Sequence, residues 1–186
     1  MKLSWHGSAC FCSFWLLYVP ALAYAQMEHT HPPAADMDCT KLSPGLQAVV
    51  AAMGTGGVTV QVSEKRDQAP AVEAGMKRLE LVLHPMSAVR PVAGKVKAGE
   101  NPDGVFGGFI RFVSPADGVY RISADSTVWL DVLDEDQPRE RARETSRLHC
   151  GKIEKSLGFA LARGHSYWIE LSASKRREVS LLISPE

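Results

Sequence analysis

From Gly57 to Ile183 the sequence consists of short segments in which apolar and polar residues alternate. One run is V-T-V-Q-V at 58–62, and another is L-E-L-V-L at 79–83. This period of two places every second side chain on the same face of a strand. Turn sequences such as N-P-D-G at 101–104 and S-P-A-D-G at 114–118 separate the runs. The expected strands cover residues 58–62, 79–83, 105–113, 119–123, 127–133, 157–161, 166–171 and 179–183. This pattern predicts a mainly β fold, an antiparallel β-sandwich of the jelly-roll kind with one short N-terminal helix.

The helix is expected just before the first strand. Ser43 can cap its first turn, and Pro44 suits the first helical position. Apolar residues then recur at three- to four-residue spacing from Leu46 to Met53. The G-T-G-G sequence that starts at residue 54 ends the helix.

Residues 1–25 have the features of an export signal. They begin with a positive charge at Lys2, continue with an apolar run over residues 10–22, and end with the small-residue pattern A-Y-A at Ala25. The apolar run is too short to span a bilayer. We therefore expect cleavage after Ala25 and a periplasmic or secreted mature protein without a membrane span.

Cleavage leaves Cys39 and Cys150 as the two cysteines of the mature chain. They are 111 positions apart, and in an oxidising compartment an isolated pair of this kind most simply forms one disulfide. The alternative is a redox-active or metal-binding thiolate pair, but the chain has no C-x-x-C motif. The disulfide is expected to pin the helical start against the strand-rich half.

The mature chain divides into a leader and a single domain. Residues 26–38 are polar, contain two prolines and are expected to be extended and mobile, whereas residues 39–186 suit one domain. Without Lys2 the chain has 20 basic residues against 21 acidic ones. This balance gives no global field for a polyanion, so nucleic acid is not an expected partner.

Two resemblances suggest what the domain is. The segments F-I-R-F-V-S-P-A-D-G-V-Y-R-I-S at 109–123 and F-A-L-A-R-G-H-S-Y-W-I-E-L at 159–171 are similar to prepeptidase C-terminal domains and to carbohydrate-binding sandwiches. The mature chain, from H-P-P-A-A-D-M-D-C-T-K-L-S-P-G-L at 31–46 to R-L-H-C-G-K-I-E-K-S-L at 147–157, also resembles small exported bacterial proteins often labelled homogentisate 1,2-dioxygenase. That label implies two histidines and one glutamate around a non-haem iron.

The iron ligands that the second resemblance implies are the pairs His149 with Glu154 and His165 with Glu170. Both pairs have the spacing of a His-to-Glu segment in cupins. The further histidine that cupins carry two residues earlier is replaced here by Arg147 and Arg163. A five-residue offset also places the two side chains on opposite faces of a strand, unless a bulge or turn intervenes. The alternative is a pair of surface histidines near strand ends.

Two other sets of residues are candidate ligands for a divalent metal. His29 and His31 in the leader offer imidazoles for copper or zinc, although no third ligand is fixed beside them. Asp131, Asp134 and Asp136 lie at a strand end, where oxygen-rich loops bind calcium. The alternatives are a solvated leader and an acidic loop balanced by the arginines that follow it.

A binding surface is the last candidate. Tyr167 and Trp168, together with Trp129, can stack on a sugar if they are exposed. Arg141 and Arg143 can contact an anionic partner, although interleaved acidic residues also suit a solvated hairpin face. We expect an exported noncatalytic binding or accessory module without a cofactor, whose partner is an envelope protein or a carbohydrate. The alternative is a metal-dependent enzyme of the dioxygenase type.

Overall fold

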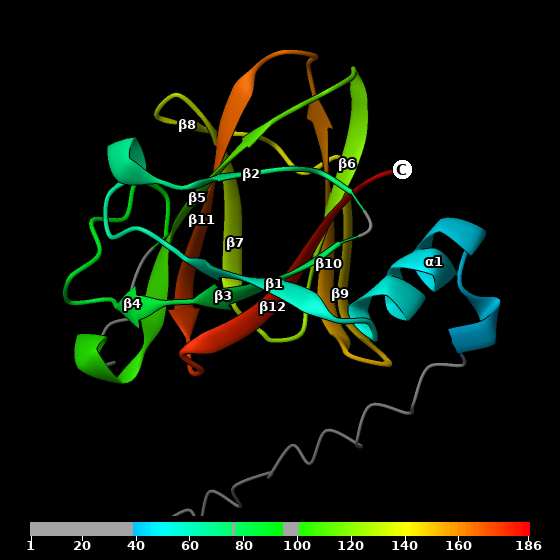
Figure 1. The fold of residues 1–186 in the computed structure, drawn as a ribbon, viewed down its shortest axis with the longest axis horizontal. Helices are drawn as coiled ribbons and strands as arrows, with labels where there is room; N and C mark the ends of the chain where they lie inside the picture. Colours follow the sequence, from blue (N-terminus) through cyan, green and yellow to red (C-terminus); the bar gives the residue numbers. More distant parts are fainter. Residues whose placement is uncertain (1–38, 76, 95–100) are drawn as a thin grey trace, which may run out of the picture. The chain divides into compact units, whose positions relative to one another are not determined.

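Two β-sheets packed face to face form the body of the protein (Figure 1). The structure is a computed structural model that describes residues 39–75, 77–94 and 101–186. The predicted signal peptide and leader, residues 1–38, lie outside the described residues. The structure confirms the mainly β sandwich with one short helix. None of the helices in the described ranges is long and apolar enough to cross a membrane.

The first sheet, sheet A, has six strands. Their spatial order is β1 (Gly57–Gln61), β3 (Arg78–Val82), β12 (Glu178–Pro185), β6 (Gly118–Ala124), β10 (Ile153–Leu161) and β9 (Arg143–Cys150). Sheet B has the order β2 (Ala71–Val72), β5 (Phe106–Val113), β11 (Ser166–Ser174), β7 (Trp129–Asp134) and β8 (Gln137–Pro138), and β4 (His84–Pro85) also pairs with β5. The helices are η1 (Cys39–Lys41), α1 (Pro44–Met53), η2 (Arg66–Gln68) and η3 (Pro102–Gly104).

Both sheets are mixed, because a parallel pair lies at one edge of each. β1 runs parallel to β3, and β2 runs parallel to β5. Between β1 and β3 the chain crosses to sheet B, forms β2 there, and returns. It therefore re-enters sheet A in the direction in which it left, and the remaining strand pairs are antiparallel.

The inner faces of the two sheets form the main core, as the alternation in the sequence predicts. β7 contributes Leu130 and Val132 to this core, and β11 contributes Tyr167, Ile169 and Leu171. Contributions from sheet A include Leu81, Ile122, Leu157, Phe159 and Leu181. Burial of one such side chain contributes about 1.5–3 kcal/mol relative to leaving it in water.

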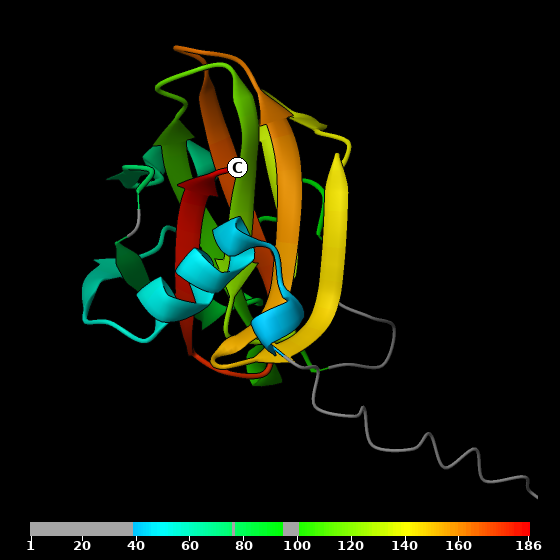
Figure 2. The ribbon, with the colours of Figure 1, turned by 90° about the vertical axis from the view of Figure 1, so that its right-hand side faces the viewer.

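Helix α1 covers part of the outer face of sheet A (Figure 2). Ser43 caps the helix by accepting a hydrogen bond from the Leu46 N–H (3.4 Å), and Pro44 is its first residue. Val49 and Met53 pack against Leu182 of β12 in a second apolar cluster. The predicted helix, including its cap, is confirmed.

Cys39 and Cys150 are in disulfide geometry, with 5.5 Å between their Cα atoms. Cys150 is fully buried and belongs to the apolar cluster under α1. The pair joins η1, next to the helix, to the end of edge strand β9. The expected link between the helical start and the strand-rich half is therefore compatible with the fold.

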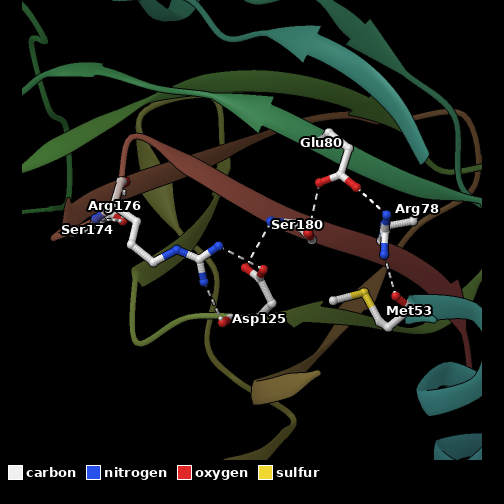
Figure 3. A network of polar contacts seen from close by, with 7 residues as sticks. All are labelled: Met53, Arg78, Glu80, Asp125, Ser174, Arg176 and Ser180. Atoms are coloured by element: carbon white, nitrogen blue, oxygen red, sulfur yellow. Dashed lines mark hydrogen bonds and ion pairs between the residues drawn. The ribbon is translucent and has the colours of Figure 1, made fainter. Parts of the chain in front are cut away.

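A chain of polar contacts fastens the end of α1 to sheet A (Figure 3). Arg78 of β3 donates to the Met53 carbonyl (2.6 Å) and pairs with Glu80. Glu80 in turn accepts a hydrogen bond from the Ser180 hydroxyl of β12 (2.8 Å). The backbone N–H of the same Ser180 donates to the carboxylate of Asp125 (2.9 Å), a residue that follows β6. These contacts link the helix end to β3, β12 and the turn after β6.

One long strand was missing from the prediction. No strand was expected between residues 133 and 157, but β9 runs from Arg143 to Cys150 within this stretch. β9 is the edge strand of sheet A, with β10 as its neighbour. Edge strands need no alternating apolar pattern and often carry charges that oppose aggregation. A pattern search based on alternation therefore overlooks such a strand.

Exchange of both cysteines for alanine should lower the free energy of unfolding by about 2–4 kcal/mol, because the unfolded chain regains the freedom of a long loop. Urea unfolding of the Cys39→Ala/Cys150→Ala variant, followed by circular dichroism, measures this change. The unmodified protein in reductant serves as the control and should unfold at a similar urea concentration. Equal stability of the oxidised protein and the variant would contradict a stabilising cross-link.

Candidate functional site

Trp129, at the start of β7, is the most exposed large apolar side chain in the described part of the protein. The side chains of this kind that are exposed are Val58, Val92, Val113 and Trp129, and Trp129 leads them at 48%. Val128 and Leu130 on either side of it are fully buried in the main core. Strand alternation therefore turns the indole away from the core. A large exposed aromatic side chain on an ordered strand is a candidate contact for a ligand.

Two cations flank the indole ring. The Arg141 Cζ lies 5.6 Å from the ring centroid, and the Lys155 Nζ lies 5.4 Å from it. Lys155 comes from β10, and its ammonium donates a hydrogen bond to the Val128 carbonyl (3.0 Å). Both separations suit cation–π attraction. The Trp129 ring therefore lies between two positively charged side chains, Arg141 and Lys155, that come from other parts of the chain.

Asp131 lies two residues further along β7 and is directed to the same side. Its Oδ1 is 3.9 Å from an Arg141 guanidinium nitrogen, while its Oδ2 is buried and has no hydrogen-bond partner among the described residues. Burial raises the pKa of Asp131 above its ordinary value, and the nearby Glu170 charge raises this pKa further. Arg141, a hydrogen bond from Trp129 and Lys155 act in the opposite direction, but the net pKa shift is upward.

Glu170 of β11 stands directly opposite Asp131 and is fully buried. Its carboxylate accepts hydrogen bonds from three successive backbone N–H groups, those of Val92 (2.7 Å), Ala93 (3.1 Å) and Gly94. A Cβ atom at Gly94 would overlap both the Glu170 carboxylate and the Ser172 hydroxyl, so the close approach requires glycine. The three N–H donors compensate the buried charge of Glu170. They also hold the loop of residues 92–94 on the outer face of sheet B.

The loop closes a small third layer over sheet B. Met86, Val89 and Val105 pack on Phe109 and Leu133, which face outward from β5 and β7. Trp168 is half-buried at the border of this cluster. The outer face of sheet B is therefore apolar and covered near Leu133, and polar with an exposed indole near Trp129.

The structure changes which residues carry the predicted binding surface. Tyr167 is buried in the main core, where its hydroxyl accepts a hydrogen bond from the Ala162 N–H (2.9 Å). Trp168 is half-buried beneath the guanidinium of Arg66, 4.9 Å from the ring centroid. Arg143 Nε is 3.0 Å from a Glu186 carboxylate oxygen. Of the three aromatic side chains predicted for a stacking surface, Trp129 is the exposed one, and the predicted contact Arg141 lies beside it.

The pairs that the dioxygenase resemblance implies are placed differently. His165 is exposed in the turn before β11, stacked near the Tyr167 ring, whereas Glu170 is buried and bound to the loop. These two side chains do not converge. His149 and Glu154 flank the Cys150–Ile153 pair that closes the β9–β10 hairpin, so a turn does intervene between them, but the His149 side chain lies outside the described residues.

The three aspartates proposed for calcium are also separated. Each is next to a different arginine: Asp131 with Arg141 (3.9 Å), Asp134 with Arg139 (3.7 Å) and Asp136 with Arg66. Glu135 at the tip of the β7–β8 hairpin takes a left-handed conformation with φ 54°. Within the described residues no three His, Cys, Asp or Glu side chains are grouped as metal ligands. His29 and His31 lie outside the described residues, so metal binding there stays a prediction.

A cleft of ≈ 720 Å³ lies beside the site. Its walls are the β7–β8 hairpin and residues 139–142, and Ala160 of β10 forms part of its lining. Arg141 borders this cleft and also lies over the Trp129 ring. The volume is within the range of small-ligand sites. The exposed indole and the cleft therefore share one cation.

Comparison with known proteins assigns no family. No model of a known protein family matches the chain, and no characterised protein matches it significantly. The resemblances expected from the sequence stay predictions.

Glu170→Gln should lower the free energy of unfolding by about 1.5–3 kcal/mol or more, because an amide cannot accept from three backbone N–H groups as the buried carboxylate does. Urea unfolding measures the loss. Glu73→Gln is the matched control, since Glu73 is exposed and should change stability by no more than ~0.5 kcal/mol. Equal effects of the two substitutions would show that the buried contact contributes nothing.

Asp131→Asn should stabilise the protein more at neutral pH than in acid. Because the pKa of Asp131 is raised on folding, folding favours its protonated form. The stability that this proton contributes is complete below the unfolded pKa and is lost as pH rises through the folded pKa. Asparagine does not titrate, so the variant does not lose this stability as pH rises. Its free energy of unfolding relative to that of the unmodified protein should therefore increase from below pH 3.8 to neutrality. Urea unfolding across this pH range tests it, and a pH-independent difference would refute it.

Proposed function

We propose that the protein is an exported, noncatalytic carbohydrate-binding module whose binding surface is centred on Trp129. The observation that carries this proposal is the 48% exposure of the Trp129 side chain on an ordered strand, surrounded by charged hydrogen-bonding groups. Asp131 offers acceptor oxygens, and Arg141 and Lys155 offer donors. This combination of a flat apolar ring and both kinds of polar group suits a sugar.

A sugar ring has an apolar face of C–H groups and a rim of hydroxyl groups. The apolar face can cover the exposed part of the indole, which gains about 25 cal/mol per Å² of apolar surface removed from water. The rim hydroxyls can donate to Asp131 and accept from Arg141. The Lys155–Val128 hydrogen bond holds one cation in place before any ligand arrives. The entropy cost of ordering this side chain on binding is therefore smaller.

Several features support export and a binding role together. The A-Y-A pattern at Ala25 suits a signal cleavage site, and the Cys39–Cys150 pair suits an oxidising compartment. A β-sandwich presents rigid strands and loops on which binding residues can be placed. The periplasmic or secreted location belongs to the proposal.

The binding role fits the geometry better than the dioxygenase alternative does. Glu170 uses its carboxylate to hold backbone N–H groups, and His165 lies on the surface away from it. The pair therefore offers no shared coordination point. Trp129 and Arg141, in contrast, face one accessible region next to a cleft.

Trp129→Ala should weaken glycan binding by at least about 10-fold, which corresponds to the loss expected for a central aromatic contact. Isothermal titration of the exported protein with cello-, chito- and galacturono-oligosaccharides measures it. Val113→Ala is the control, because Val113 is similarly exposed but on another strand, and should leave affinity unchanged. Binding that survives in Trp129→Ala would refute the proposed surface.

A further inference from the structure

The positively and negatively charged side chains around Trp129 differ in how accessible they are to a ligand. Arg141 and Lys155 lie within 5.6 and 5.4 Å of the ring centroid. Of the carboxylates that the structure describes near Trp129, Glu170 is fully buried and its charge is compensated by three backbone N–H groups. Asp131 is the partly accessible one, with 17% of its side chain exposed. Among the described side chains, a ligand at the indole therefore meets the two cations and the partly accessible carboxylate of Asp131.

The contact between Asp131 and Arg141 is loose. Their nearest oxygen and nitrogen are 3.9 Å apart, which is longer than a charge-assisted hydrogen bond of about 2.7–2.9 Å. The other Asp131 oxygen is buried without a hydrogen bond, and Glu170 stands opposite with the same charge. Burial and the Glu170 charge disfavour the ionised carboxylate where it lies, and Arg141 opposes this effect without cancelling it. A stronger acceptor can therefore replace Asp131 as one of the partners of Arg141.

We propose that the ligand of the Trp129 surface is an acidic carbohydrate, whose carboxylate or sulfate group takes the place of Asp131 beside Arg141 and Lys155. This inference rests on the proposed carbohydrate-binding function and specifies its ligand class. The sugar ring covers Trp129, and the acidic substituent reaches the two flanking cations. Arg141 suits this role because its planar guanidinium can bind a carboxylate or sulfate through two parallel hydrogen bonds.

Asp131 then acts as an internal competitor of the ligand. When it is ionised, it attracts Arg141 and repels the acidic substituent, and when it is protonated it does neither. The groups that face it are Trp129 from its own strand, Glu170 from β11, Lys155 from β10 and Arg141 from the segment after β8. Affinity for an acidic ligand should therefore rise as Asp131 takes up a proton. The upward pKa shift of Asp131 brings this transition closer to neutral pH.

The test compares three probes of equal length: an oligogalacturonate, a sulfated galacto-oligosaccharide and its neutral parent. The sulfate does not titrate in the pH range used, so any pH dependence of its binding belongs to the protein. At neutral pH and low salt, Asp131→Asn should raise affinity for the two acidic probes about 2- to 5-fold, the size expected for one partly exposed charge interaction. It should not raise affinity for the neutral probe.

Two controls complete the experiment. Glu73→Gln removes the same unit of negative charge just after β2, at the opposite edge of sheet B from β8, and should leave affinity unchanged. In the unmodified protein, affinity for the sulfated probe should rise as pH falls, whereas Asp131→Asn should bind it equally across that range. Arg141→Gln should lower affinity for the acidic probes toward that for the neutral one.

The outcomes separate this inference from the function on which it rests. If Trp129→Ala abolishes binding but the neutral probe binds as tightly as the acidic ones, carbohydrate binding holds and the acidic ligand is refuted. An Asp131→Asn variant that binds the sulfated probe no better than the unmodified protein also refutes the competition. If none of the three probes binds, and the oligosaccharides that test Trp129 fail as well, both proposals fall.

Discussion

The outer face of sheet B depends on the burial of one carboxylate, that of Glu170, against three backbone N–H groups. A buried charge without such partners would cost several kcal/mol, so the loop that supplies the N–H groups and the strand that supplies the carboxylate stabilise each other. The same loop carries Ala93 into the apolar layer over Phe109 and Leu133. Glu170 also sets the electrostatic environment of Asp131 on the next strand. One side chain thus links the shape of this face to its charge.

Much of the fold follows from local sequence pattern. Alternation located the long core strands, and Ser43, Pro44 and the apolar spacing located the helix, because each of these signals depends on residues close together in the chain. β9 and the two-residue strands β2, β4 and β8 escaped prediction. They are edge or peripheral strands, and pairing with a neighbour stabilises them rather than an apolar face of their own.

The candidate site was less accessible to sequence reasoning because it depends on strand register. Asp131 and Glu170 were candidate ligands for two different metals, yet β7 and β11 place them opposite each other. Asp136 pairs with Arg66, which is 70 residues away. Neither contact leaves a local signature. The position of Trp129 did leave one, since Val128 and Leu130 are core residues and strand alternation turns the residue between them outward.

The order of strands in the two sheets has a consequence for how the chain folds. β12 lies between β3 and β6, and β11 lies between β5 and β7, so strands from the last part of the sequence fill interior positions of both sheets. Neither sheet can be completed until β11 and β12 are available. Cys39 and Cys150 both precede these two strands in the sequence. Contacts so distant in sequence make folding slow and leave unpaired strand edges open to aggregation in the meantime. A cross-link formed early would shorten the search by holding β9 near the helix while the last strands insert.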